Sequence, residues 1–182
     1  MTFRIAAFAM GIALTSLCVC PVARTHAGSP EVRAGLAELE RNKAVVRRVY
    51  EKGLSRGVFE VPYTPDFVGH GGDTTFRHAD GIAEAKGWRL AFPDLNVKVD
   101  LILAEGDLVS VRWTARGTNT GAGNGIPATG KQVKISGTTV FRMADGAIAE
   151  EWTSGDSLGL LKQLGLFPAP VVATGAAPAP AQ

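Results

Sequence analysis

Cysteine is almost absent from this chain of 182 residues, which has only Cys18 and Cys20. Both lie in the first 27 residues, a segment that we expect to be removed. Without them the chain has no thiol, which excludes disulfides, cysteine nucleophiles and thiolate metal sites. Histidine is scarce too, because only His70 and His78 follow that segment. No serine stands near either histidine in a recognisable nucleophile elbow, so a hydrolytic triad has no support.

A surplus of positive charge is also missing. All seventeen acidic residues follow position 27, whereas two of the nineteen basic residues, Arg4 and Arg24, precede it. The remaining chain is therefore neutral, and its lysines and arginines are dispersed along the sequence. Nucleic-acid binding requires a basic footprint that this chain lacks. We therefore predict a small-molecule partner and no nucleic acid.

The first 27 residues resemble an export signal. Arg4 supplies a positive charge, an apolar stretch runs from Ile5 to Val19, and Thr25-His26-Ala27 is an acceptable cleavage site. The apolar stretch is about 15 residues long, whereas roughly 20 are needed to span a bilayer. The sequence thus predicts a signal peptide at residues 1–27 and an exported protein, periplasmic or secreted, with no membrane association after cleavage. A retained membrane anchor is the alternative.

The far end of the chain has the composition of a disordered tail. Residues 168–182 read PAPVVATGAAPAPAQ, with no aromatic and no charged residue. Such a segment cannot bury enough apolar surface to offset the entropy of ordering it. Residues 30–167 remain as one domain with one core.

Hydrophobic periodicity divides this domain into a helical first half and a sheet-rich second half. Apolar residues recur at helical spacing over 38–56 and 80–91, separated by a short extended piece at 66–70. Alternation with period two then marks strands at 95–101, 109–115, 133–141 and 148–154, before a short final helix. Helices packed on one face of a curved antiparallel sheet predict an α+β fold with a pocket between the layers.

Seven pieces of the sequence, in order, resemble the SnoaL-like polyketide cyclase or ester cyclase family. They are NKAVVRRVYE, PDFVGH, AFPDL, GDLVSVRWTARGTNTG, GIPATGK, FRMADGAIAEEW and SGDSLGLLKQLG. The resemblance covers about residues 42–167. It implies the cone-shaped fold of nuclear transport factor two with an apolar pocket, a homodimer, and neither a metal nor a cofactor.

The resemblance also implies a chemistry centred on one carboxylate. Cyclases of this family remove a proton alpha to a carbonyl, form an enolate and return the proton. Their aspartate corresponds to Asp156 here, and burial beside Trp152 would raise the pKa of that carboxyl. A competing interpretation stays open, because Asp156 precedes Ser-Leu-Gly-Leu-Leu and makes a good helix N-cap, which is worth about 1 kcal/mol.

His70, in the block PDFVGH, is the second candidate catalytic residue, either orienting the substrate or carrying a proton. A solvated loop histidine is the alternative. Asn119 stands where many relatives have the histidine of RGTH, and with His70 it could polarise a carbonyl. His78 is expected at the surface. No third ligand accompanies the two histidines, so we predict no metal site.

A substrate cavity is predicted to be lined by aromatic side chains and one hydroxyl, although core packing is the alternative for each aromatic. These candidate substrate-binding residues are Trp88, Phe92, Trp113, Trp152 and Thr139. Arg112 is expected to pair with Glu150 or Glu151 on the outer face of the sheet.

Two functions from different classes follow. The first is a cofactor-independent cyclase or isomerase acting on a small carbonyl-containing, polyketide-like or polycyclic substrate. It predicts that Asp156 and His70 point into one cavity. The second is a binding module of the same fold without catalysis, in which the polar groups do not converge. An epoxide hydrolase ranks last, because only Asp156 has a clear claim to a pocket position.

Overall fold

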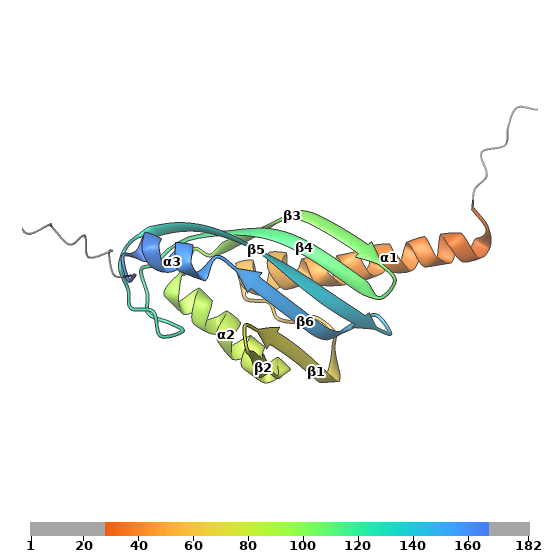
Figure 1. Ribbon diagram of the computed structural model, residues 1–182, viewed down its shortest axis with the longest axis horizontal. Coiled ribbons are helices and arrows are strands. Elements are labelled where there is room, and N and C mark those ends of the chain that lie inside the picture. Colours follow the sequence, from red (N-terminus) through yellow and green to blue (C-terminus); the bar gives the residue numbers. More distant parts are fainter. Residues whose placement is uncertain (1–27, 168–182) are drawn as a thin grey trace, which may run out of the picture.

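The computed structural model describes residues 28–167, which fold into one curved sheet with three helices (Figure 1). The predicted signal peptide at 1–27 and the predicted tail at 168–182 lie outside the described residues.

The sheet has six strands in the order β2-β1-β6-β5-β4-β3. They are β1 (Tyr63–Gly71), β2 (Thr74–Phe76), β3 (Asn96–Glu105), β4 (Leu108–Thr118), β5 (Gln132–Ala144) and β6 (Ala147–Gly155). The four strands predicted from the alternating pattern are β3 to β6, and they form the predicted antiparallel meander. The short extended piece predicted at 66–70 lies within β1, which pairs parallel to β6 and brings the first half of the chain beside the last strand.

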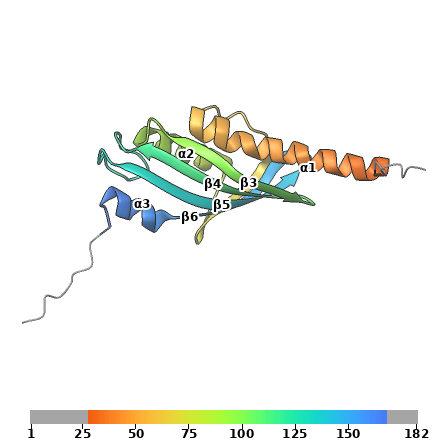
Figure 2. The same cartoon turned by 90° about the horizontal axis from the view of Figure 1, so that it is seen from above.

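The helices begin at positions fixed by their caps. α1 (Pro30–Arg48) starts before the predicted position because Ser29 Oγ accepts the N–H of Val32 at 3.3 Å. It continues into a π-helical turn, η1 (Val49–Leu54). α2 (His78–Ala91) starts where the N–H of Arg77 donates to Asp80 at 3.1 Å. Figure 2 shows α1 and α2 lying over the same face of the sheet, which is the predicted α+β arrangement.

The core lies between these helices and the sheet. Val46, Val111, Phe141 and Ile148 are at most 1% exposed and belong to its larger cluster. A smaller apolar cluster packs the end of α2 against α3 (Ser157–Leu164). Within residues 28–167, no helix combines the length and apolar character needed to cross a membrane.

Candidate active site

A cavity of about 560 Å³ lies between the helices and the concave face of the sheet. Its wall is mainly apolar, with contributions from η1, all six strands, α2 and α3. The polar side chains in this wall include Tyr50, Tyr63, Thr74, His78, Glu84, Arg116, Thr139, Glu151, Thr153 and Ser157. The cavity therefore presents polar groups on a mainly apolar background, as small-molecule sites do.

An irregularity in β6 places Glu151 inside this cavity. Met143 pairs with Ile148 but Arg142 pairs with Glu150, so Ala149 is an extra residue between two ladder partners. Such a bulge exchanges the two faces of a strand beyond it. Ile148 is buried in the core, and past the bulge Glu151 and Thr153 line the cavity.

Burial changes the acidity of the groups around Glu151. Loss of hydration raises the pKa of the Glu151 carboxyl from 4.5 to about 7, and the negative charge of Glu84 adds to this shift. Burial likewise raises the pKa values of the Tyr50 and Tyr63 phenols, with Glu151 contributing in both cases. Near neutral pH the cavity therefore holds a carboxyl able to accept and return a proton, beside two protonated phenols.

The raised pKa of Glu151 makes stability depend on pH. Below pH 4.5 the carboxyl is protonated in both states, and between 4.5 and about 7 only the unfolded chain ionises. The free energy of unfolding should therefore fall as pH rises through this window and level off above about 7. The expected loss is roughly 2–3 kcal/mol, reduced because the cavity admits water. In the variant Glu151→Gln, urea unfolding measured at several pH values should not show this loss. The same dependence of the free energy of unfolding on pH in both proteins would contradict the raised pKa of Glu151.

Three further polar side chains in the wall form a chain of hydrogen bonds. Trp113 Nε1 donates to Thr139 Oγ1 at 3.2 Å, and Thr139 Oγ1 lies 3.0 Å from Thr153 Oγ1. Thr139 is 2% exposed, whereas Thr153 keeps an open surface toward the cavity. The last member of this hydrogen-bond chain, Thr153, lies two residues from Glu151 on the same face of β6.

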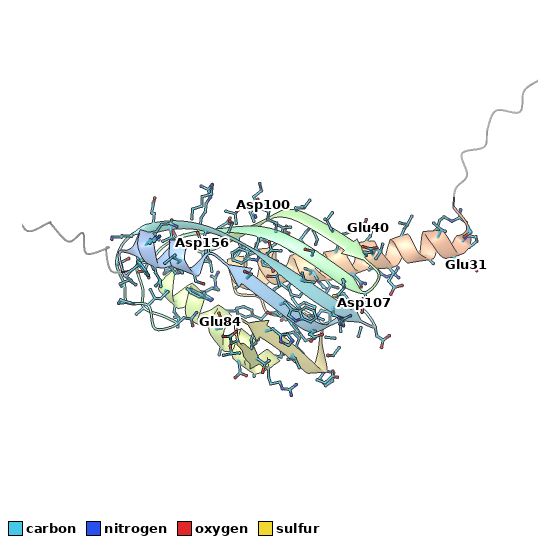
Figure 3. All side chains as sticks on the ribbon, viewed as in Figure 1. Glu31, Glu40, Glu84, Asp100, Asp107 and Asp156 are labelled. Carbon is cyan, nitrogen blue, oxygen red and sulfur yellow. The ribbon has the colours of Figure 1, made fainter. Side chains whose placement is uncertain are left out.

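The structure places Asp156 outside this cavity. Its carboxylate Oδ1 accepts the N–H of Gly159 at 2.8 Å and caps α3, and the residue is solvent-exposed. Figure 3 shows Asp156 at the junction of β6 and α3, whereas Glu84 lies on α2. The expected burial beside Trp152 does not occur, because the cap directs the carboxylate to the first turn of the helix.

His70 also lies away from the cavity wall, so the expectation that it shares a cavity with Asp156 is wrong. Its ring stacks on Trp152 with centroids 5.3 Å apart, and its Nε2 lies 2.9 Å from Glu150 Oε1. Trp152 was expected in the cavity, but the bulge turns it to the opposite face, where Arg142 covers its ring. Glu150 pairs with Arg142 rather than with the expected Arg112.

Asn119 is a structural residue and not a cavity residue. Its side chain is fully buried, and its Nδ2 donates to the carbonyls of Ala91 and Gly121 at 3.1 and 2.9 Å. Its Oδ1 accepts the N–H and the hydroxyl of Thr129 at 2.9 and 2.8 Å. The amide thus makes all the bonds that it readily can: the bond to Ala91 ties the loop after β4 to the end of α2, and the other three hold the loop itself together.

Four of the predicted substrate-binding residues, Trp88, Phe92, Trp113 and Thr139, do line the cavity. Two residues that sequence reasoning did not place there are Glu151 and His78, whose ring stacks on Tyr63 with centroids 4.2 Å apart. Across residues 28–167, no group of three or more His, Asp or Glu side chains is arranged to hold a metal ion.

Comparison with known proteins gives a consistent result. The profile of the SnoaL-like polyketide cyclase matches residues 44–164. AclR of Streptomyces galilaeus is 30% identical, with 72% of this chain and 89% of AclR covered at a TM-score of 0.64. IdmH of Streptomyces antibioticus is 28% identical, and the match covers 68% of this chain and 98% of IdmH with a TM-score of 0.59. A protein of Jannaschia sp. CCS1 is 26% identical, with 78% and 98% covered at 0.64. Among curated proteins there is no significant match.

Proposed function

This chain belongs to the SnoaL-like polyketide cyclase family, and from that premise we propose that it is a cyclase or isomerase in which Glu151 transfers the proton. The substrate is a small, largely apolar molecule with a carbonyl group, polyketide-like or polycyclic. The single observation that carries this proposal is the position of Glu151, a desolvated carboxyl in the wall of a mainly apolar cavity.

The chemistry needs one group that is first a base and then an acid. The Glu151 carboxylate removes a proton from the carbon alpha to the carbonyl, and the C–H electron pair moves onto the carbonyl oxygen as an enolate. In an isomerisation, Glu151 returns the proton to another carbon. In a cyclisation, the enolate carbon attacks a second carbonyl of the same molecule, and the new alkoxide takes the proton from Glu151.

The surroundings of Glu151 support both halves of this cycle. Its pKa of about 7 leaves protonated and ionised forms populated at neutral pH. The aromatic rings of Trp88, Phe92 and Trp113 offer apolar surface to a flat ligand. AclR is provisionally assigned as a hydroxylase and IdmH as a polyketide cyclase. Only the polyketide cyclase assignment corresponds to the proton transfer proposed here.

Proton exchange on a simple ketone tests the proposal without knowledge of the natural substrate. β-Tetralone, a bicyclic ketone with acidic alpha protons, is incubated with the protein in D₂O, and NMR follows the loss of its alpha-proton signals. We expect exchange faster than in buffer, with a rate that rises with pH to a plateau above about 7. Exchange no faster than with an equal concentration of acetate would contradict the proposal.

Export by the segment 1–27 and assembly as a homodimer stay predictions, from the sequence and from the family resemblance respectively.

A further inference from the structure

The hydrogen-bond chain Trp113–Thr139–Thr153 has a direction that its donors impose. An indole N–H can only donate, so Thr139 Oγ1 accepts from Trp113. Thr139 has one hydrogen of its own, and at 2% exposure that hydrogen needs an acceptor inside the protein. Thr153 Oγ1, 3.0 Å away, is such an acceptor. The Tyr50 phenol also hydrogen-bonds Thr139, but burial raises the pKa of this phenol, so it keeps its proton and can donate it to Thr139 Oγ1.

The consequence concerns the hydrogen of Thr153. If Thr139 donates to Thr153, the Thr153 hydroxyl cannot donate back along the same line. Its hydrogen is then directed elsewhere, and Thr153 lines the cavity. The opposite direction would leave the buried hydrogen of Thr139 without this acceptor, which is the costlier arrangement. Thr153 therefore accepts a hydrogen bond from Thr139 and keeps its own hydrogen free to donate to a ligand in the cavity.

The spacing between this donor and Glu151 suits an alpha proton and its carbonyl oxygen. Glu151 and Thr153 are alternate residues on one face of β6, so their backbones are about 6.6 Å apart at a rise of about 3.3 Å per residue. In an enolate the oxygen is two bonds from the carbon that lost the proton. One ketone can thus place its alpha carbon at the Glu151 carboxyl and its oxygen at the Thr153 hydroxyl.

On the basis of the proposed function, we propose that Thr153 is a catalytic residue that donates a hydrogen bond to the substrate oxygen on which the enolate charge develops. Trp113 and Thr139 are positioning residues, since they act by turning the Thr153 hydrogen toward the substrate. Such a donor stabilises the enolate more than the ketone, and therefore lowers the barrier and not only the dissociation constant.

The test uses an ionised phenol as a stable enolate analogue and needs no turnover. The background is Glu151→Gln, which removes the repulsive carboxylate. The dissociation constants of β-naphtholate and of naphthalene, which has the same rings and no oxygen, are measured by fluorescence for three further substitutions. Thr153→Val keeps the shape without the hydroxyl, Thr153→Ser keeps the hydroxyl, and Trp113→Phe removes the first donor of the chain.

We expect Thr153→Val to weaken β-naphtholate binding tenfold or more and to leave naphthalene binding within about twofold. Thr153→Ser, which keeps the hydroxyl, should bind β-naphtholate with most of the affinity of its parent. Trp113→Phe should weaken naphtholate more than naphthalene, because it frees the Thr153 hydrogen to turn. Equal naphtholate affinity in Thr153→Val and its parent would overturn the role of Thr153. An equal loss for both probes in Trp113→Phe would overturn the positioning role.

Kinetics with native Glu151 separate this inference from the proposed function. In the β-tetralone assay, Thr153→Val should lower kcat about tenfold to a hundredfold with little change in KM. A wild-type protein that fails to exchange β-tetralone contradicts the proposed function, whereas the naphtholate comparison still decides whether Thr153 donates to an oxyanion. A change confined to KM in Thr153→Val would contradict the catalytic role.

Discussion

Glu151→Gln is expected to lower the rate of β-tetralone proton exchange by about 10³-fold, within the 10²–10⁴ range of general acid–base catalysis. The amide has nearly the same shape as the carboxylic acid but cannot accept a proton at any working pH. The affinity for fluorenone, a flat ketone without alpha protons, should stay within a few-fold, because the apolar wall of the cavity is unchanged. NMR gives the exchange rates, and fluorescence quenching gives the dissociation constants.

Asp156→Asn is the matched control, because it makes the same chemical change in the carboxylate that the sequence had favoured. Asparagine caps helices as well as aspartate does, so α3 should remain intact. We expect an exchange rate within about twofold of the wild type, since Asp156 is exposed and lies outside the cavity wall. A large loss in Asp156→Asn together with a small loss in Glu151→Gln would reverse the assignment of the acid/base residue.

The second large effect is on stability. Asn119→Ala should lower the free energy of unfolding by roughly 3–5 kcal/mol, because it removes the four hydrogen bonds of a fully buried amide and opens a small void. The carbonyl of Gly121 loses its partner, whereas the carbonyl of Ala91 still accepts the N–H of Gly121 at 3.2 Å. The N–H of Thr129 loses the side-chain acceptor and keeps only its bond to the backbone carbonyl of residue 119 at 3.1 Å. Urea unfolding at neutral pH measures the change.

Thr120→Ala is the control, since Thr120 is the exposed neighbour of Asn119 in the same loop. It should change the free energy of unfolding by about 0.5 kcal/mol or less. Exchange activity per folded molecule of Asn119→Ala should stay near that of the wild type at low temperature. Undiminished stability combined with lost activity would instead show that Asn119 acts on the substrate, as its place in the sequence had suggested.

The fold could be predicted from the sequence because its signals are periodic and repeated. The alternation along β4 and β5 predicts one buried face, and that face is the one observed. In β3 the prediction holds as far as Val99, but the register shifts after that residue and Leu101, expected on the buried face, is 52% exposed. The parallel pairing of β1 with β6 could not be predicted in this way. It depends on which distant strand the extended piece near His70 meets, and the local pattern does not specify that.

The site was harder to predict because one residue reverses a strand. Strict alternation from Ile148 places Trp152 inside and Glu151 outside, whereas the extra residue Ala149 produces the opposite arrangement. Periodicity does not reveal a bulge, and the pair Glu150-Glu151 gave no sign of which carboxylate is buried. The capping of α3 by Asp156, by contrast, was readable, because aspartate before a leucine-rich helix is a local signal.

Titration of the Glu151 carboxyl tests the central claim most directly. In protein labelled with ¹³C at the glutamate side-chain carboxyls, the Glu151 signal is identified by its absence in Glu151→Gln and followed from acid to alkaline pH. Of the other titratable groups that line the cavity, Glu84 adds its negative charge to the effect of burial on this carboxyl. A midpoint at about 7 is the predicted result. A midpoint near 4.5, that of an ordinary hydrated glutamate, would contradict the claim that Glu151 is the desolvated proton-transfer group of the cavity.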